Sequence, residues 1–202
     1  MKSKLYSASE YKEIVKDLLN GNVVGFPTET VYGLAIVYNN KEAFDRLYEI
    51  KNRGINKPIS MMVSSIDVLN QVADIDENSE KVIKHFMPGP LTIILNAKDN
   101  LPQHVTFNNK TIGVRIPDHE IALKILKEVG LPLLVTSANI SNEPSLIKAK
   151  DVLEKFEGQI SSLINEDAID GIASSVVEVI NEVKVYREGP ISKKQLEEVI
   201  GG

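Results

Sequence analysis

Residues 23–34 read Val-Val-Gly-Phe-Pro-Thr-Glu-Thr-Val-Tyr-Gly-Leu, an apolar run followed by hydroxyls, a carboxylate and a turn glycine. The apolar run is typical of a buried strand. Packing alone does not explain so many hydrogen-bonding groups directly after a strand. Such groups are what a small polar ligand needs for its orientation. The stretch therefore predicts a strand of the central sheet and a binding site at its end.

The composition indicates a globular protein with one large core. The 202 residues are 43% hydrophobic and 25% charged, and we expect a single domain over residues 1–202. No apolar run of about 18 residues is present to cross a bilayer, and no signal-peptide core follows the first residues, so we expect a cytoplasmic protein without membrane contact. The absence of cysteine excludes disulfides, a thiolate nucleophile and cysteine-bound zinc.

The net charge of -5 argues against a protein that coats nucleic acid, because nonspecific binding depends on many cationic contacts to phosphates. A local basic cleft is still compatible with this charge. The segment Lys51-Asn-Arg-Gly-Ile-Asn-Lys57 holds three cations and no acid. A solvated helix end that complements the helix dipole explains the same segment.

Helical and extended patterns alternate along the chain, with short connections between them. A capping box at residues 7–10 and the apolar stripe behind it predict a first helix that ends at Asn20-Gly21. We expect further helices at residues 43–50, 66–73, 79–86, 121–129, 149–156 and 193–200. We expect strands at residues 23–26, 34–38, 59–63, 91–95, 112–116, 133–135, 176–180 and 183–186.

The short connection Asn181-Glu182 predicts a hairpin between the last two strands, so the sheet should contain antiparallel pairs. No internal repeat or linker is evident. The predicted fold class is α/β: a single-domain, twisted, mixed parallel and antiparallel sheet with helices packed on it.

The motifs of common nucleotide enzymes and hydrolases are missing: there is no P-loop, no Gly-x-Gly-x-x-Gly, no His-x-x-x-His and no Gly-x-Ser-x-Gly. The three histidines, His85, His104 and His119, are scattered. Surface or helix-start roles fit them better than a catalytic triad, which the sequence alone leaves open.

Polar clusters instead follow or enter several predicted strands, at residues 88–92, 111–117 and 136–139. Ligands of open α/β sheets bind in the crevice beyond strand ends, so these clusters are expected to converge. Arg115 lies inside an apolar strand pattern and needs an anionic partner. That partner is either a structural carboxylate or a carboxylate or phosphate of a ligand.

Each polar residue also has a plain structural explanation. Ser137 and Asn139 can cap a turn, Thr28 and Thr30 can bond their own backbone, and Arg187 can be an ordinary exposed strand residue. Their occurrence together favours a site.

Seven motifs occur in the order seen in the YrdC family: residues 26–34, Lys51-x-Arg53, Lys57-Pro58, Pro88-Gly-Pro-Leu-Thr92, Gly113-Val-Arg115-x-Pro117, Ser137-Ala-Asn-x-Ser141 and Arg187-x-Gly189. From about residue 7 to about residue 190, the chain resembles the threonylcarbamoyl-AMP synthases of that family, also called TsaC or YwlC proteins. The resemblance implies that L-threonine, bicarbonate or carbon dioxide, and ATP give L-threonylcarbamoyl-adenylate and pyrophosphate.

By the same resemblance, downstream transfer proteins use the adenylate to modify adenosine 37 of tRNA, and a weak direct contact with tRNA stays open. Mg²⁺ would accompany ATP, bridged mainly by phosphate oxygens, and no dedicated protein metal site is expected. The threonine amine becomes a carbamate whose oxygen attacks the α-phosphorus. This chemistry needs positioning and charge neutralisation more than an enzyme nucleophile.

The resemblance also assigns roles to residues. Lys51, Arg53 and Arg115 are the catalytic candidates, and Arg115 is expected to clamp the threonine carboxylate. The expected threonine pocket consists of Thr30, Met62, Arg115, Val135 through its backbone, and Ser174. The expected nucleotide pocket consists of Lys51, Arg53, Lys57, Thr111, Ser137, Asn139, Ser145 and Arg187.

The chain departs from the family pattern at several positions. Met62 replaces a common histidine and cannot donate a hydrogen bond, Asn142 replaces a glycine but tolerates left-handed backbone angles, and Glu188 replaces a proline beside Arg187. Two other functions share the fold: an RNA-binding module without catalysis, which the acidic charge disfavours, and a carbamoyl-transfer module like those of hydrogenase-maturation proteins. Such modules normally belong to longer chains.

Overall fold

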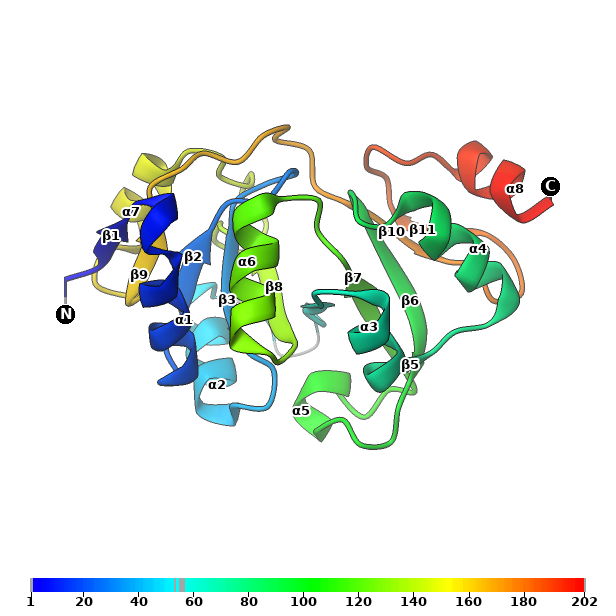
Figure 1. Ribbon diagram of the computed structural model, residues 1–202, viewed down its shortest axis with the longest axis horizontal. Helices are drawn as coiled ribbons and strands as arrows, with labels where there is room; N and C mark the ends of the chain where they lie inside the picture. Colours follow the sequence, from blue (N-terminus) through cyan, green and yellow to red (C-terminus); the bar gives the residue numbers. More distant parts are fainter. Residues whose placement is uncertain (1, 53, 55–56, 202) are drawn as a thin grey trace.

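A computed structural model describes residues 2–52, 54 and 57–201, and its centre is one continuous sheet (Figure 1). In the described residues the sheet has eleven strands, ten of them along one path and β5 (Ala73–Asp74) paired with β6 beside it. The path runs β1 (Lys4–Tyr6), β9 (Ser162–Ile164), β2 (Val24–Phe26), β3 (Gly33–Val37), β8 (Leu133–Ser137), β4 (Ser60–Met62), β7 (Thr111–Arg115), β6 (Leu91–Ala97), β10 (Ser175–Glu178), β11 (Lys184–Arg187).

Helices pack on this sheet from both sides. They are η1 (Ala8–Glu10), a 3-10 helix, and the α-helices α1 (Tyr11–Leu19), α2 (Lys41–Ile50), α3 (Ile66–Val72), α4 (Glu77–Phe86), α5 (Gln103–Thr106), α6 (Glu120–Val129), α7 (Ala149–Phe156) and α8 (Lys193–Gly201). Figure 1 shows α1 beside α6 over one half of the sheet, whereas α3 and α4 lie over the other half. No described helix combines the length and the hydropathy that a bilayer span requires.

The predicted fold class is confirmed. Strand pairs β2/β9, β4/β7 and β6/β10 are parallel, and pairs β2/β3, β3/β8 and β6/β7 are antiparallel. The predicted hairpin joins β10 to β11. The predicted capping box is also present, with the Ser7 N–H donating to Glu10 Oε2 at 2.9 Å. The short elements β1, β5, β9 and α5 were not predicted.

The strand register places alternate residues on one face of the sheet, which we call the site face. Ala35 lies opposite Val135, Met62 opposite Arg115, Ile94 opposite Gly113, and Thr92 opposite Val176. Over β2, β3 and β8, helices α1 and α6 cover this face with apolar side chains. Towards β6 and β10 the same face carries small and polar residues, and this change makes room for a cavity.

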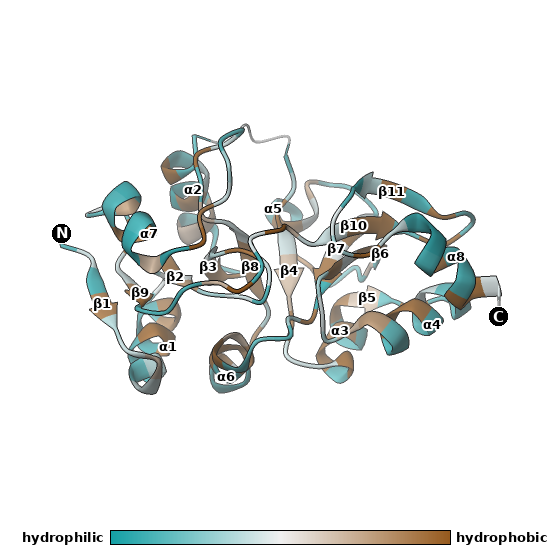
Figure 2. Ribbon diagram, turned by 90° about the horizontal axis from the view of Figure 1, so that it is seen from above, coloured by the Kyte–Doolittle hydropathy of each residue, from teal (hydrophilic) through white to brown (hydrophobic). Residues whose placement is uncertain are grey.

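The opposite face holds the larger part of the core. Leu34, Met61, Ile93 and Leu134 lie there, and each is 1% exposed or less. Figure 2 shows brown residues concentrated in the central strands, with teal residues prominent on the helices around them. Burial of these side chains stabilises the sheet on which the site face is built.

Leu34→Ala should lower the free energy of unfolding by about 2–5 kcal/mol, because it leaves a void in a core that cannot fully collapse. Urea denaturation followed by circular dichroism measures this change. Leu5→Ala is the matched control, because Leu5 is 43% exposed on the edge strand β1. The control should stay within about 0.5 kcal/mol of the parent protein. Equal losses in both variants would contradict the described packing.

Candidate functional site

A cavity of about 330 Å³ opens on the site face. Its walls come from the segment after β2 and from strands β4, β6, β7, β8, β10 and β11. A volume of this size lies within the range of small-molecule sites in proteins. The polar segments that the sequence placed at separate strand ends therefore meet around one hollow.

Two glycines keep the cavity open. A Cβ atom on Gly113 would lie 3.2 Å from Thr92 Cγ2 and 3.5 Å from Ser60 Oγ. A Cβ atom on Gly33 would lie 2.9 Å from Val135 Cγ1. A side chain at either position would fill the space that a ligand needs, which explains why glycine stands in both motifs.

Arg115 lies in the cavity wall at the end of β7, and only 6% of it is exposed. Its Nη2 is 2.7 Å from Glu29 Oε1 and donates to Thr30 Oγ1 at 2.9 Å. The structural partner that the buried guanidinium requires is therefore Glu29. Within the described residues, Arg115 Nε is buried and has no hydrogen-bond partner. The ion pair and the hydrogen bond to Thr30 therefore do not use all five N–H donors of the guanidinium.

The segment that carries Glu29 and Thr30 is fixed on both sides. Glu29 Oε1 accepts a hydrogen bond from the Asp118 N–H at 3.0 Å. The carbonyl groups of residues 28–30 accept hydrogen bonds from the N–H groups of residues 169–171, at 3.2, 3.1 and 2.7 Å in order. Thr28 Oγ1 donates to the Val31 carbonyl at 2.7 Å, so the plain backbone-bonding explanation holds for Thr28. Thr30 Oγ1 instead meets Arg115.

The opposite wall is built around Ser174. Its hydroxyl lies 2.9 Å from Thr92 Oγ1. Arg187 donates from Nε to the Ser174 carbonyl at 2.9 Å and from Nη2 to Ser174 Oγ at 3.0 Å. A Cβ atom on Gly189 would lie 2.4 Å from Ser175 N and 2.5 Å from Ala173 O. The Arg-x-Gly motif therefore holds the backbone of the Ser174 wall against β11.

Lys51 is buried, with 1% of its surface exposed, and it is not among the cavity-lining residues. Its Nζ donates to the carbonyls of Ser137 and Asn139, the latter at 2.7 Å, and to Asn139 Oδ1 at 3.0 Å. Asn139 Nδ2 in turn donates to the Glu143 carbonyl at 2.6 Å. The Lys51 ammonium therefore fixes the turn after β8, which carries Ser137 into the cavity wall.

The structure brings all five predicted threonine residues together in the cavity lining, with two of the eight predicted nucleotide residues. The cavity lining includes Thr30, Met62, Arg115, Val135, Ser137, Ser174 and Arg187. It does not include Lys51, Lys57, Thr111, Asn139 or Ser145. Arg53 lies outside the described residues. The binding roles of all these residues stay predictions.

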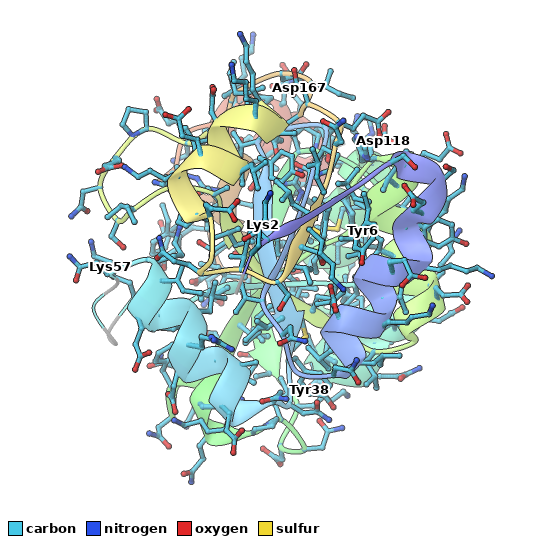
Figure 3. All side chains as sticks on the ribbon, turned by 90° about the vertical axis from the view of Figure 1, so that its left-hand side faces the viewer. Lys2, Tyr6, Tyr38, Lys57, Asp118 and Asp167 are labelled. Atoms are coloured by element: carbon cyan, nitrogen blue, oxygen red, sulfur yellow. The ribbon has the colours of Figure 1, made fainter. Side chains whose placement is uncertain are left out.

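The residues away from the lining have identifiable positions. Thr111 is the first residue of β7 and Arg115 is the last, so the two lie at opposite ends of this strand. Lys57 is exposed and donates to Asn142 Oδ1 at 3.0 Å. Figure 3 shows Lys57 at the outer margin of the molecule, beyond the end of α2. Asn142 has a φ of +71°, the left-handed conformation expected where relatives have glycine.

Three contributors were not assigned from the sequence. Glu29 is the ion-pair partner of Arg115, Thr92 supports Ser174, and Tyr186 lines the cavity beside Arg187. Glu29 and Thr92 both lie inside the quoted motifs, and this position in the motifs could have identified them as site residues. Nothing in the sequence marked Tyr186.

None of the three histidines belongs to the described lining of the cavity. His104 Nε2 lies 3.0 Å from the Tyr38 carbonyl, and its ring packs edge-on against Phe44. Burial lowers the pKa of His119 at the start of α6, which favours the neutral ring. The described cavity therefore presents guanidinium and hydroxyl groups and no described histidine.

Comparison with known proteins supplies independent findings. A model of the Sua5/YciO/YrdC family, described as "Telomere recombination", matches residues 16–189. Threonylcarbamoyl-AMP synthase of Bacillus subtilis (strain 168) is 37% identical over 188 residues, which cover 91% of this chain and 54% of the relative. Threonylcarbamoyl-AMP synthase of Pyrococcus abyssi is 38% identical over 185 residues, which cover 90% and 54% respectively.

A solved structure has the same fold over the whole chain. The crystal structure of P. abyssi Sua5 complexed with L-threonine has a TM-score of 0.92 and 32% identity, and the match covers 100% of this chain and 61% of that one. The match spans about half the length of the B. subtilis and P. abyssi synthases.

Gly189→Ala should destabilise the protein by about 1–3 kcal/mol, because the new methyl group meets backbone atoms that cannot move aside. Urea denaturation measures the loss. Gly201→Ala is the matched control, because no described atom lies within 4 Å of its Cβ position in α8. Unchanged stability in Gly189→Ala would mean that the Ser174 wall is not packed as described.

Proposed function

The chain belongs to the Sua5/YciO/YrdC family, and we propose that it is a threonylcarbamoyl-AMP synthase. The observation that carries the proposal is the single cavity in which Arg115 and Thr30 face Ser137, Ser174 and Arg187. The relatives named threonylcarbamoyl-AMP synthase support the proposed reaction. The Sua5 structure complexed with L-threonine supports L-threonine as the amino-acid substrate.

Arg115 binds the threonine carboxylate in the proposed mechanism. A guanidinium presents N–H groups in a planar fork that matches a carboxylate. Glu29 and Thr30 orient that fork from behind, through the bonds to Nη2. The apolar side chains of Met62 and Val135 line the same cavity and provide contact for the threonine methyl group.

The cavity promotes the reaction by holding the substrates in position. The threonine amine and bicarbonate form a carbamate with loss of water. A carbamate oxygen attacks the α-phosphorus of ATP, the bond from that phosphorus to the bridging oxygen breaks, and pyrophosphate leaves. Holding both substrates in one cavity makes this attack effectively unimolecular. In the proposal, Arg187 and Ser137, which line the cavity, contact the nucleotide, and Lys57 on the outer loop contacts the leaving phosphates.

Mg²⁺ belongs to the proposal as a partner that would enter with ATP. Metal binding to the triphosphate would supply charge neutralisation during loss of pyrophosphate. In the part of the chain that the structure describes, no group of three or more His, Cys, Asp or Glu side chains is placed to hold a metal ion. The product is an activated acyl adenylate, which the proposed downstream tRNA-modifying transfer proteins would consume.

Purified protein mixed with ATP, Mg²⁺, bicarbonate and L-threonine should release pyrophosphate and form a product with the mass of threonylcarbamoyl-adenylate. Arg115→Ala should lower kcat/KM for threonine by at least about 10²-fold, because a preorganised charged donor is lost. Arg115→Lys keeps the positive charge but loses the planar fork of N–H groups. Its kcat/KM for threonine should therefore lie between the values of the parent and of Arg115→Ala. Arg46→Ala, on the exposed side of α2, is the control, and its kcat/KM for threonine should equal that of the parent.

Thermal unfolding of each variant separates loss of activity from loss of folding, because Arg115→Ala leaves Glu29 without its partner. Pyrophosphate release that does not depend on threonine would reject the assignment. Steeply salt-dependent tRNA binding without ATP turnover would instead favour the RNA-binding alternative.

Threonine should be preferred over serine by about tenfold in kcat/KM, because one methyl group in an apolar pocket is worth roughly that much. The comparison uses the same pyrophosphate assay with each amino acid. Met62→Ala should reduce this preference, because it removes part of the apolar wall. Equal use of the two amino acids by the parent protein would show that Met62 and Val135 do not contact the methyl group.

A further inference from the structure

Tyr186 is an exposed aromatic residue in the described part of the cavity lining. It lines the cavity, and 60% of it is exposed. The other aromatic residue in the described lining, Tyr32, is fully buried, and its hydroxyl donates to the Ile164 carbonyl. Tyr186 therefore presents an accessible aromatic ring at the rim of the site.

A β-bulge turns Tyr186 towards the cavity. Val176 pairs with Arg187, whereas the next residue, Val177, pairs with Val185. Two steps along β11 therefore correspond to one step along β10, and Tyr186 is the extra residue. In a regular strand, Tyr186 and Arg187 would point to opposite faces. The bulge lets both line the same cavity, and bulges often re-aim side chains in this way beside active sites.

Hydrogen bonds hold the two neighbours in place. The Tyr186 hydroxyl donates to Glu178 Oε2 at 2.9 Å, and this bond raises the pKa of the phenol, so the ring stays neutral. Arg187 is held by the carbonyl and hydroxyl oxygens of Ser174. The aromatic ring at the rim is thus fixed beside a guanidinium that is anchored in the cavity wall.

We propose that Tyr186 is the platform on which the base of the nucleotide stacks, an inference that rests on the proposed function. The strands β7 and β11 are separated by three strand spacings, or about 14 Å. Threonine bound to Arg115 occupies the β7 end, and the α-phosphorus must lie beside its carbamate. The adenosine then extends along the cavity towards β11, where the Tyr186 ring meets the base.

Stacking on a tyrosine ring does not discriminate among bases, because every base has a π-face. Tyr186 therefore contributes to nucleotide affinity and not to the choice of adenine over guanine. Inorganic tripolyphosphate lacks the base, so its binding affinity should not depend on Tyr186. This difference separates stacking from a general effect on the shape or charge of the cavity.

Isothermal titration with Mg-ATP and with Mg-tripolyphosphate tests the proposal. Tyr186→Ala should weaken ATP binding by about tenfold, the lower part of the range for loss of one stacked base, and leave tripolyphosphate binding unchanged. Tyr186→Phe should keep the parental ATP affinity, because it keeps the ring. Leu5→Ala, which removes an exposed apolar side chain from the opposite edge of the sheet, is the control and should bind as the parent does.

Parental ATP affinity in Tyr186→Ala would overturn the proposal, and so would an equal loss of affinity for tripolyphosphate. If either result came with threonine-dependent pyrophosphate release by the parent protein, the proposed function would stand and only the stacking role would fall. A parent protein that binds no ATP would reject both.

Discussion

The buried ion pair between Arg115 and Glu29 is the interaction on which the site depends. A guanidinium inside an apolar strand is tolerated only when a nearby group compensates its charge. Glu29 provides that compensation, and the neighbouring Thr30 accepts a hydrogen bond from the same nitrogen across 85 residues of sequence. The pair therefore ties the end of β7 to the segment after β2. Without this ion pair, Arg115 at the end of β7 would no longer be bonded to Glu29 in the segment after β2.

The same pair is compatible with ligand binding, because it uses only part of the guanidinium. Arg115 offers five N–H donors, and the bonds to Glu29 and Thr30 both involve Nη2. Arg115 also lines the cavity, which Gly113 and Gly33 keep open. Under the proposed function, one side chain would form the structural ion pair and bind the threonine carboxylate. This double use would explain why an Arg is placed inside a strand that otherwise packs the core.

The sequence predicted the long elements and the convergence of the polar clusters, because periodicity and motif order are local signals. It missed β1 and β9, since three-residue strands are specified by their pairing partners, here with residues about 158 positions away. The expected role of Lys51 at the triphosphate stays a prediction; the structure adds that its ammonium is buried and donates to Asn139, a position that sequence does not show. Tyr186 was not predicted because its orientation depends on a bulge between two strands.

The most direct test of the account is a crystal structure of this protein with L-threonine and a non-hydrolysable ATP analogue. The threonine carboxylate should lie within hydrogen-bond distance of the Arg115 guanidinium, with Glu29 still paired to Nη2 and the α-phosphorus beside the threonine amine. A threonine carboxylate bound away from Arg115, or a nucleotide bound outside the cavity that Arg115 and Arg187 share, would contradict it.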